Sequence, residues 1–428
     1  MCCGKAAFGV GESLGHCAYF QLVAEFSHPG VALSKNFSEK DMNQEFVTRK
    51  LVPVFILVIF CCAPIFAQTD TWIHAEPTRV VPQQLAVFSC NGQTTVNSRW
   101  VFNDGGYRVT QTPVVTRAGN TISLDTRVEE YTGGRTLAIV PFEKNFDIGT
   151  LEPGTYTLNV KSWDAPLKQI QFTLRSTPPA PQPIDGPCFF VTQQYRDFLS
   201  REPDGSGFSF WTNDLTSCGM DAQCLEVKRI NVSAAFVVSI EFHETGYYVY
   251  RMYRAALGRR PTFAEFVPEA AQVGQNVIAG SNDAWAARLS NNKDIYTTGF
   301  FNRPDFQARY AGLTTAQYVD KLFETEGITP TPVERAGLID SVDKCTADIG
   351  CPTRATVLRR IVENAAFDRK VFNEAFVTME YFGYLRRDPD ANGLQFWLSK
   401  LNQFNGDYVG AEMVKAFINS DEYRKRFP

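Results

Sequence analysis

Residues 202–211 read EPDGSGFSFW, and residues 388–397 read DPDANGLQFW. Each stretch follows a Tyr-rich apolar segment that ends in Arg, and each opens a new apolar segment. The two stretches begin 186 positions apart (388 − 202), which indicates an internal repeat. A repeat of this kind predicts small units that cannot bury their apolar faces alone and therefore share a core with their neighbours.

The surrounding segments carry apolar residues at helical spacing. They are residues 189–200, 207–215, 227–242, 247–257, 318–342, 354–372, 375–397 and 410–427. We count about four degenerate units, of which the first and last are best preserved. The two middle units lack the Gly-x-x-Phe-Trp segment, so they are either structural filler or not independent copies. The pattern predicts an all-α helical repeat domain over residues 188–428.

The repeated stretch has the composition of a joint between two helices. Its proline stops one helix, the following aspartate caps the next, and a glycine three residues later permits tight packing. The Phe-Trp pair is expected to anchor in the core. These residues are Pro203, Asp204, Gly207, Phe210 and Trp211 in the first copy, and Pro389, Asp390, Gly393, Phe396 and Trp397 in the second.

A calcium site is the alternative interpretation of the second stretch. Asp388, Asp390 and Asn392, followed by Gly393, match the start of an EF-hand loop. The glutamate that should close such a loop is missing, because its position holds Ser399. Calcium is therefore a candidate with an incomplete ligand set, and the sequence indicates no other cofactor.

The N-terminal region has the layout of an export signal. Residues 51–67 form an uncharged apolar run that follows Arg49 and Lys50 and ends at the small residue Ala67. We interpret residues 42–67 as a signal peptide and residues 1–41 as a mis-called extension that precedes the true start at Met42. A retained membrane anchor is the alternative, although the run is marginal in length for a membrane span.

Export explains the use of cysteine. Five of the 11 cysteines lie at or before the predicted cut, and an even number, six, remain. We read them as disulfides rather than metal thiolates. Cys218 and Cys224 have the same spacing as Cys345 and Cys351, so each pair is expected to form a local disulfide. For Cys90 and Cys188 two options remain: a bridge between the domains, or two buried thiols.

Residues 69–178 read as an all-β domain, because short strand-like runs alternate with turns rich in Gly, Asn and Pro. The segment LEPGTYTLNV (151–160) resembles the closing hairpin of bacterial immunoglobulin-like or fibronectin-like modules. No second cysteine follows Cys90 within this domain, so an antibody-type domain is not expected. An immunoglobulin-like sandwich is predicted here, followed by a Pro-rich linker over 179–187.

The helical half resembles a known family. The segments YRDFLSREPDGSGFSFW (195–211), YFGYLRRDPDANGLQFW (381–397) and AFINSDEYRKRF (416–427) resemble a bacterial family of exported helical domains of unknown function. That family is distantly similar to phycobilisome linker domains. The resemblance covers roughly residues 189–428, and it implies a secreted or cell-envelope protein of the kind often found near calcium-binding repeats.

Function is less specified than fold. His74 and His243 are the only histidines that follow the predicted cleavage site, and His243-Glu244 is expected in a surface turn. The sequence matches none of the common hydrolase or phosphate-binding motifs. A net charge of −4 gives no basic footprint for nucleic acid. We therefore predict a secreted, periplasmic or cell-surface protein without catalytic activity or a membrane span, which binds a protein or envelope glycan through its helical domain. An extracellular glycan-acting hydrolase is the alternative.

Overall fold

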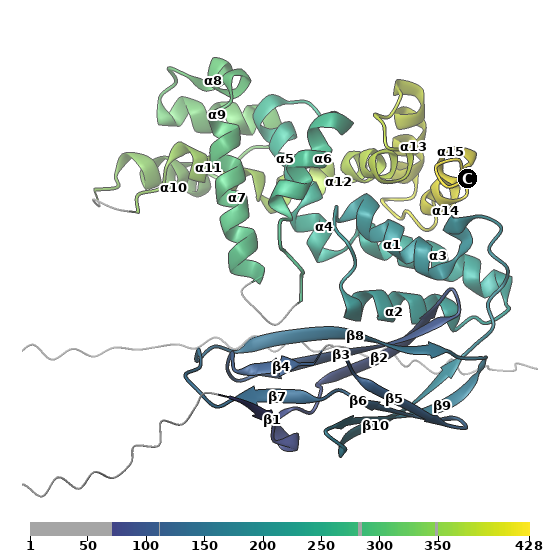
Figure 1. The fold of residues 1–428 in the computed structure, drawn as a ribbon. Helices are drawn as coiled ribbons and strands as arrows, with labels where there is room; N and C mark the ends of the chain where they lie inside the picture. The colour runs from purple at the N-terminus through teal and green to yellow at the C-terminus, as the bar shows by residue number, and fades with distance from the viewer. Residues whose placement is uncertain (1–70, 111, 281–284, 347–349) are drawn as a thin grey trace, which may run out of the picture. The chain divides into compact units, whose positions relative to one another are not determined.

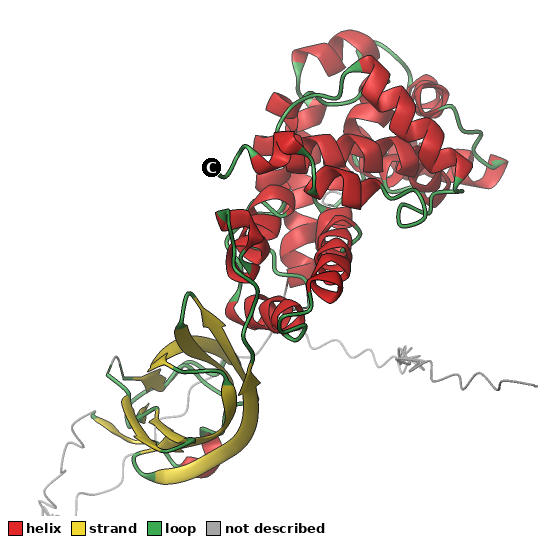
Figure 2. Cartoon of the chain, turned by 90° about the vertical axis from the view of Figure 1, so that its right-hand side faces the viewer, coloured by secondary structure: helices red, strands yellow, loops and turns green. Residues whose placement is uncertain are grey.

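The computed structural model describes residues 71–110, 112–280, 285–346 and 350–428 (Figure 1). The predicted extension and signal peptide, residues 1–41 and 42–67, lie outside the described residues. Strands occupy residues 72–174 and helices occupy residues 187–424. Figure 2 shows the same division by colour, so the predicted order of an all-β part followed by an all-α part is confirmed.

The β part is a sandwich. Its strands are β1 (Trp72–His74), β2 (Gln84–Cys90), β3 (Gln93–Phe102), β4 (Tyr107–Val109), β5 (Val114–Ala118), β6 (Thr121–Asp125), β7 (Val128–Tyr131), β8 (Val140–Thr150), β9 (Gly154–Ser162) and β10 (Ala165–Leu174). Three hydrogen-bonded sheets have the orders β2-β3-β8, β10-β9-β6-β5 and β1-β7-β4. Strands β6 and β9 pair in parallel, and the other pairs are antiparallel.

The sandwich core follows from the two-residue period of its strands. In β9 the alternate residues Tyr156, Leu158 and Val160 are buried, because successive side chains of a strand point to opposite faces. Trp100 of β3 is fully buried in the core of the sandwich, and its indole N–H donates to the Val80 carbonyl at 2.9 Å. A buried indole needs such a partner, so this bond belongs to the core rather than to a ligand site.

The α part contains α1 (Pro187–Phe198), α2 (Gly205–Thr216), α3 (Ala222–Val237), α4 (Ile240–Glu244), α5 (Gly246–Leu257), α6 (Phe263–Val273), α7 (Trp285–Phe301), α8 (Pro304–Tyr310), α9 (Thr315–Glu326), α10 (Pro332–Asp343), α11 (Arg354–Val362), α12 (Ala365–Glu380), a π-turn η3 (Tyr381–Leu385), α13 (Ala391–Gln403), α14 (Met413–Ile418) and α15 (Asp421–Arg424). Helix α5 is buried over most of its length and packs against α4, α6, α9, α11 and α12. Among the described residues, no helix combines the length and apolar character needed to cross a membrane.

Helices α2, α6, α10 and α13 begin in the same way. A proline stops the preceding segment, and the next residue caps the helix by accepting the backbone N–H three positions on. The caps are Asp204, Thr262, Thr331 and Asp390. The predicted joint therefore occurs at its two expected positions, and the middle of the chain builds two more joints without the Gly-x-x-Phe-Trp segment.

The Pro-rich segment before α1 is held against the helices. It contains a short turn, η2 (Pro183–Asp185), in which Ile184 is fully buried. The carboxylate of Asp185 accepts two hydrogen bonds from the guanidinium of Arg424 in α15, at 2.8 and 2.9 Å. This segment is thus anchored to the C-terminal helices as well as connecting the two domains.

Candidate functional site

The first joint contains a compact stack of ionic and aromatic groups. The guanidinium of Arg201 lies 4.8 Å from the ring centre of Tyr195. It donates to both carboxylate oxygens of Glu241 at 2.6 and 3.0 Å, and to the capping carboxylate of Asp204 at 3.2 Å. Arginine suits this position because its planar fork can stack on a ring and bind a carboxylate with two bonds at once.

The second joint repeats this geometry. Arg387 lies 5.2 Å from the ring centre of Tyr381, donates to both oxygens of Glu422 at 2.6 and 3.1 Å, and lies 3.5 Å from Asp390. Tyr381 also packs edge to face on Phe417, with 5.1 Å between the ring centres. In the first joint Tyr195 packs in the same way on Phe236, at 4.7 Å. The repeated sequence therefore builds the same set of contacts twice.

The glycine of each joint is required by a close approach. A Cβ atom on Gly207 would lie 2.1 Å from the hydroxyl oxygen of Tyr195, and one on Gly393 would lie 2.1 Å from that of Tyr381. Each tyrosine therefore presses its hydroxyl group against the first turn of the capped helix, where no other residue leaves room.

The two joints differ in exposure. The side chains of Arg201 and Glu241 are 19% and 9% exposed, whereas those of Arg387 and Glu422 are 41% and 48% exposed. The first joint is covered by the loop after α6, whose residue Ala279 donates its backbone N–H to Glu241 at 3.1 Å. The second joint lies open at the surface.

The expectation that both residues of each Phe-Trp pair anchor in the core is wrong for the phenylalanines, and each tryptophan does pack against the core. Phe210 and Phe396 are 63% and 58% exposed, while Trp211 and Trp397 are half-buried against the helical core. Consecutive residues of a helix point about 100° apart, so one residue of the pair faces the core and the other faces outward. Each phenylalanine packs edge to face on the neighbouring tryptophan, with 4.8 Å between the ring centres in the first joint and 5.0 Å in the second.

Two of the three calcium candidates, Asp388 and Asp390, have separate partners within the protein. Asp388 accepts the backbone N–H of Phe263 at 2.9 Å, and Asp390 accepts that of Gly393 at 2.8 Å. Asn392 is exposed in the first turn of α13. No group of three or more His, Cys, Asp or Glu side chains suited to a metal occurs within the described ranges. A calcium site at Asp388, Asp390 and Asn392 stays a prediction from the sequence.

Three disulfides are formed among the described residues. Cys218 pairs with Cys224, and Cys345 pairs with Cys351, each across six positions. Cys90 at the end of β2 pairs with Cys188 in the first turn of α1. Of the two options left by the sequence for Cys90 and Cys188, the structure therefore has the bridge between the domains.

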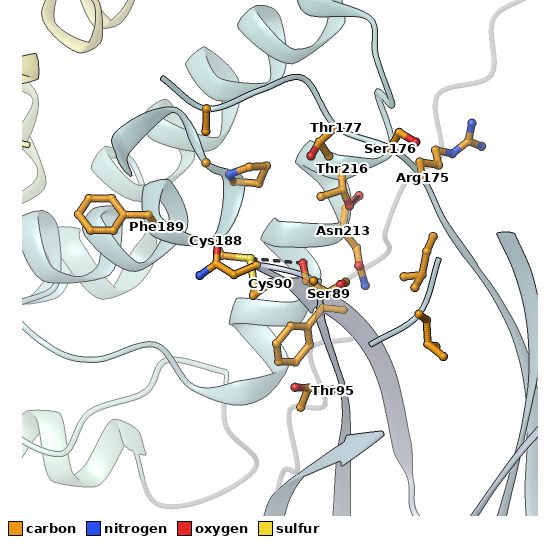
Figure 3. Close-up of a pocket in the computed structure, with 18 of the residues that line it drawn as sticks. Ser89, Cys90, Thr95, Arg175, Ser176, Thr177, Cys188, Phe189, Asn213 and Thr216 are labelled. Carbon is orange, nitrogen blue, oxygen red and sulfur yellow. Dashed lines mark hydrogen bonds between the residues drawn. A yellow bond between two sulfur atoms is a disulfide. The ribbon is translucent and has the colours of Figure 1, made fainter. Parts of the chain in front are cut away.

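A cleft of about 1200 Å³ opens beside this bridge (Figure 3). Its walls come from the ends of the sandwich strands, from the Pro-rich segment, and from α1 and α2. Figure 3 shows hydroxyl and amide side chains around the disulfide, including Ser89, Thr95, Thr177 and Asn213. Asn213 of α2 also donates to the Val87 carbonyl of β2 at 2.8 Å, which helps to fix the two walls.

Sequence reasoning missed this cleft. Its polar residues are scattered from Ser89 to Thr216 and follow no helical or strand period. The one signal was the unassigned pair Cys90 and Cys188, since a bridge between domains would have brought these segments together.

A charged cluster surrounds His243, which lies in α4 and is half-buried, so the expectation of a surface turn is wrong. Its Nδ1 lies 2.9 Å from Glu244 and its Nε2 lies 3.2 Å from Asp368 of α12. The buried cations Arg251 and Lys293 pair with Asp368 and Glu244 respectively. Hydrogen bonds with Asp368 and Glu244 raise the pKa of His243, and its own bond lowers the pKa of Glu244 to about 2.

This cluster lacks a nucleophile. Within the described part of the chain, no Ser, Thr or Cys side chain is hydrogen-bonded to His243. A histidine between carboxylates activates an attacking group when such a group is in reach. Here the cluster instead ties together α4, α5, α7 and α12.

Glu380, the last residue of α12, is a further group that the sequence did not single out. It is fully buried, and neither carboxylate oxygen has a partner among the described residues. Burial without a partner raises the pKa of Glu380 well above its usual range and so favours the neutral carboxyl. The residue 186 positions earlier is Gln194, also fully buried, which accepts from the Ser233 hydroxyl at 2.8 Å. Comparing the repeat copies in sequence would have identified this difference.

Comparison with known proteins covers the end of the chain. No curated protein matches the sequence, and no solved structure does. Residues 359–427 match the family model described as "Domain of unknown function (DUF4214)". The match runs from within α11 to α15 and includes the second joint with Arg387, Asp390 and Gly393. The C-terminal helices between residues 359 and 427 are therefore similar to this domain of unknown function.

Proposed function

We propose that this chain is a secreted or cell-surface binding protein without catalytic activity, and that its ligand is a cell-envelope component, either protein or glycan. Disulfides persist in oxidising compartments outside the cytosol, and three are formed among the described residues. The predicted export signal is consistent with this location.

The cleft beside Cys90 and Cys188 is the observation that carries this proposal. Its two walls belong to different domains and are joined by a disulfide, a shared hydrogen bond and an edge-to-face contact of Phe88 with Phe208 at 5.2 Å. Binding sites are usually concave, formed before the ligand arrives, and often placed between domains. Helices α1 and α2 supply one wall, so the proposed site includes residues of the helical domain.

The lining favours binding over hydrolysis. Glycoside hydrolases commonly use two carboxyl groups about 5–10 Å apart across the bond that breaks. Glu152 is the one carboxylate among the described residues that line the cleft, and it is exposed. The cleft therefore supports the non-catalytic interpretation rather than the glycan-acting hydrolase.

Co-sedimentation with bacterial cell-envelope fractions tests the proposal. The oxidised protein, residues 69–428, is expected to bind the insoluble fraction saturably and to release no soluble product. Replacing Thr177 by Trp fills part of the cleft and should abolish binding. The matched control Thr116→Trp, on β5 and outside the lining, should leave binding unchanged. Equal binding by all three proteins, or no binding by the parent protein, would overturn the proposal.

A further inference from the structure

The charge of the cleft lining restricts the chemistry of its ligand. Among the described residues that line it, two side chains are ionisable, Glu152 and Arg175, and they are of opposite sign and exposed to solvent. Water screens exposed charges of this kind, so the cleft offers no strong field of either sign. Sites that select phosphates, sulfates or carboxylates use clustered Arg and Lys instead.

Hydroxyl and amide groups replace charge as the polar chemistry of the cleft. The side-chain hydroxyls of Thr95, Thr150 and Thr177 have no hydrogen-bond partner in the described part of the chain, and Asn213 uses its amide N–H₂ while leaving its amide oxygen without a partner there. A hydroxyl both donates and accepts, and an amide oxygen accepts twice. These groups complement a ligand whose own groups also donate and accept, as sugar hydroxyls do.

Rigid apolar surfaces lie among these polar groups. Pro153, Pro178 and Pro181 line the cleft, whereas the ring of Phe189 packs away from it on Phe427. Proline rings present flat C–H faces at little entropic cost, which suits the apolar face of a pyranose ring. The alternation of such faces with free hydroxyls differs from the continuous apolar groove that receives a peptide helix.

We infer that the cleft binds an uncharged oligosaccharide, a neutral segment of an envelope glycan. This inference rests on the proposed function and identifies its ligand class. A volume of about 1200 Å³ exceeds the usual range of about 300–1000 Å³ for small-molecule sites, which favours several linked sugar units over a single small metabolite.

Calorimetry on the oxidised protein tests the inference with neutral and charged probes. The neutral probes are the hexasaccharides of maltose, cellulose and mannan type, whose vicinal diols periodate cleaves, and the charged probe is hexagalacturonate. We expect at least one neutral probe to bind, with an affinity that does not change between about 50 mM and about 500 mM salt because no ion pair forms. Binding of hexagalacturonate alone, or binding that salt abolishes, would overturn the inference.

Two single-hydroxyl variants locate the site. Thr95→Val and Thr177→Val keep the side-chain shape and remove one hydrogen bond each, which should weaken binding by about fivefold. The control Thr116→Val removes a hydroxyl outside the lining and should bind like the parent protein. Equal affinity of all four proteins would show that the sugar binds elsewhere.

Treating the envelope fractions separates this inference from the proposed function. Periodate cleaves sugar diols, so it should abolish co-sedimentation, whereas protease treatment of the envelope should not. If protease abolishes binding and periodate does not, the ligand is a protein, and the inference fails while the proposed function stands. If untreated fractions fail to bind, both fail.

Discussion

Replacing Glu380 by Gln is expected to stabilise the protein by an amount that grows with pH. Burial raises the pKa of Glu380 in the folded state, whereas the unfolded carboxyl ionises near its ordinary 4.5. The folded protein therefore keeps a proton that the unfolded chain releases above pH 4.5. Stability from this group is fully present below pH 4.5 and is lost as pH rises towards the folded pKa.

The size of the effect follows from the proton balance. One bound proton changes the free energy of unfolding by about 1.4 kcal/mol per pH unit. For each pH unit between 4.5 and the folded pKa the buried acid therefore loses about 1.4 kcal/mol of stability, and the variant Glu380→Gln avoids this loss because an amide does not titrate. The change keeps the shape of the side chain, and any difference in hydrogen bonding adds an offset that does not vary with pH.

Urea unfolding followed by far-UV circular dichroism at pH 5, 6, 7 and 8 measures this difference. Glu326, whose pKa burial raises to about 9, titrates in both proteins and cancels. The matched reverse variant is Gln194→Glu, which places a carboxyl at the equivalent buried position and should lose stability with the same slope. A gap between Glu380→Gln and the parent that stays flat from pH 5 to pH 8 would refute the reasoning, because Glu380 would then be ionised in the folded protein.

Three further outcomes are expected. Hydrogen bonds with carboxylates raise the pKa of His243, so its stabilising contribution is fully present below pH 6.5 and is lost as pH rises through its folded pKa. The destabilisation by His243→Gln, measured by urea titration, should therefore shrink between pH 6 and pH 8.5. A constant difference in unfolding free energy between the variant and the parent protein would contradict this. Replacing Cys90 and Cys188 by Ser should cost about 4–5 kcal/mol in the chain-entropy model, since the bridge spans 98 positions, and an unchanged denaturation midpoint would argue against it. Gly393→Ala should destabilise the folded protein by about 1–3 kcal/mol, because the new Cβ meets the hydroxyl of Tyr381. Adding Tyr381→Phe should recover part of the lost stability, as measured by calorimetric melting. If no stability is recovered, the clash is with another contact.

Local chemistry explains what the sequence could predict. The helix caps at Asp204 and Asp390 were predictable because a cap needs only a short polar side chain and a nearby backbone N–H. The burial of Phe210 and Phe396 was predicted wrongly, since composition shows that a Phe-Trp pair is apolar but does not show which residue faces the core. That assignment depends on how the helix is rotated against its neighbours.

Tertiary contacts explain what the sequence could not predict. The cleft exists because Cys90 and Cys188 join two segments 98 positions apart, and two cysteines alone did not specify this pairing. The hydroxyls of Thr95 and Thr177 carry no sequence signal, since a half-buried threonine in a strand or linker is ordinary. Their role appears only once the two walls are placed together.

The two copies of the second helix also show how one unit is adapted to different surroundings. In α2, Ser209 is buried and Phe208 packs on Phe88 of the sandwich, so the side of this helix that borders the sandwich is covered. In α13 the residue equivalent to Ser209 is Gln395, which is exposed, and Leu394 replaces Phe208. A repeat that borders another domain can bury its outer face, whereas one that borders water needs a polar outer face. The repeated joint therefore specifies the unit, and the outward positions of the following helix specify what the unit packs against.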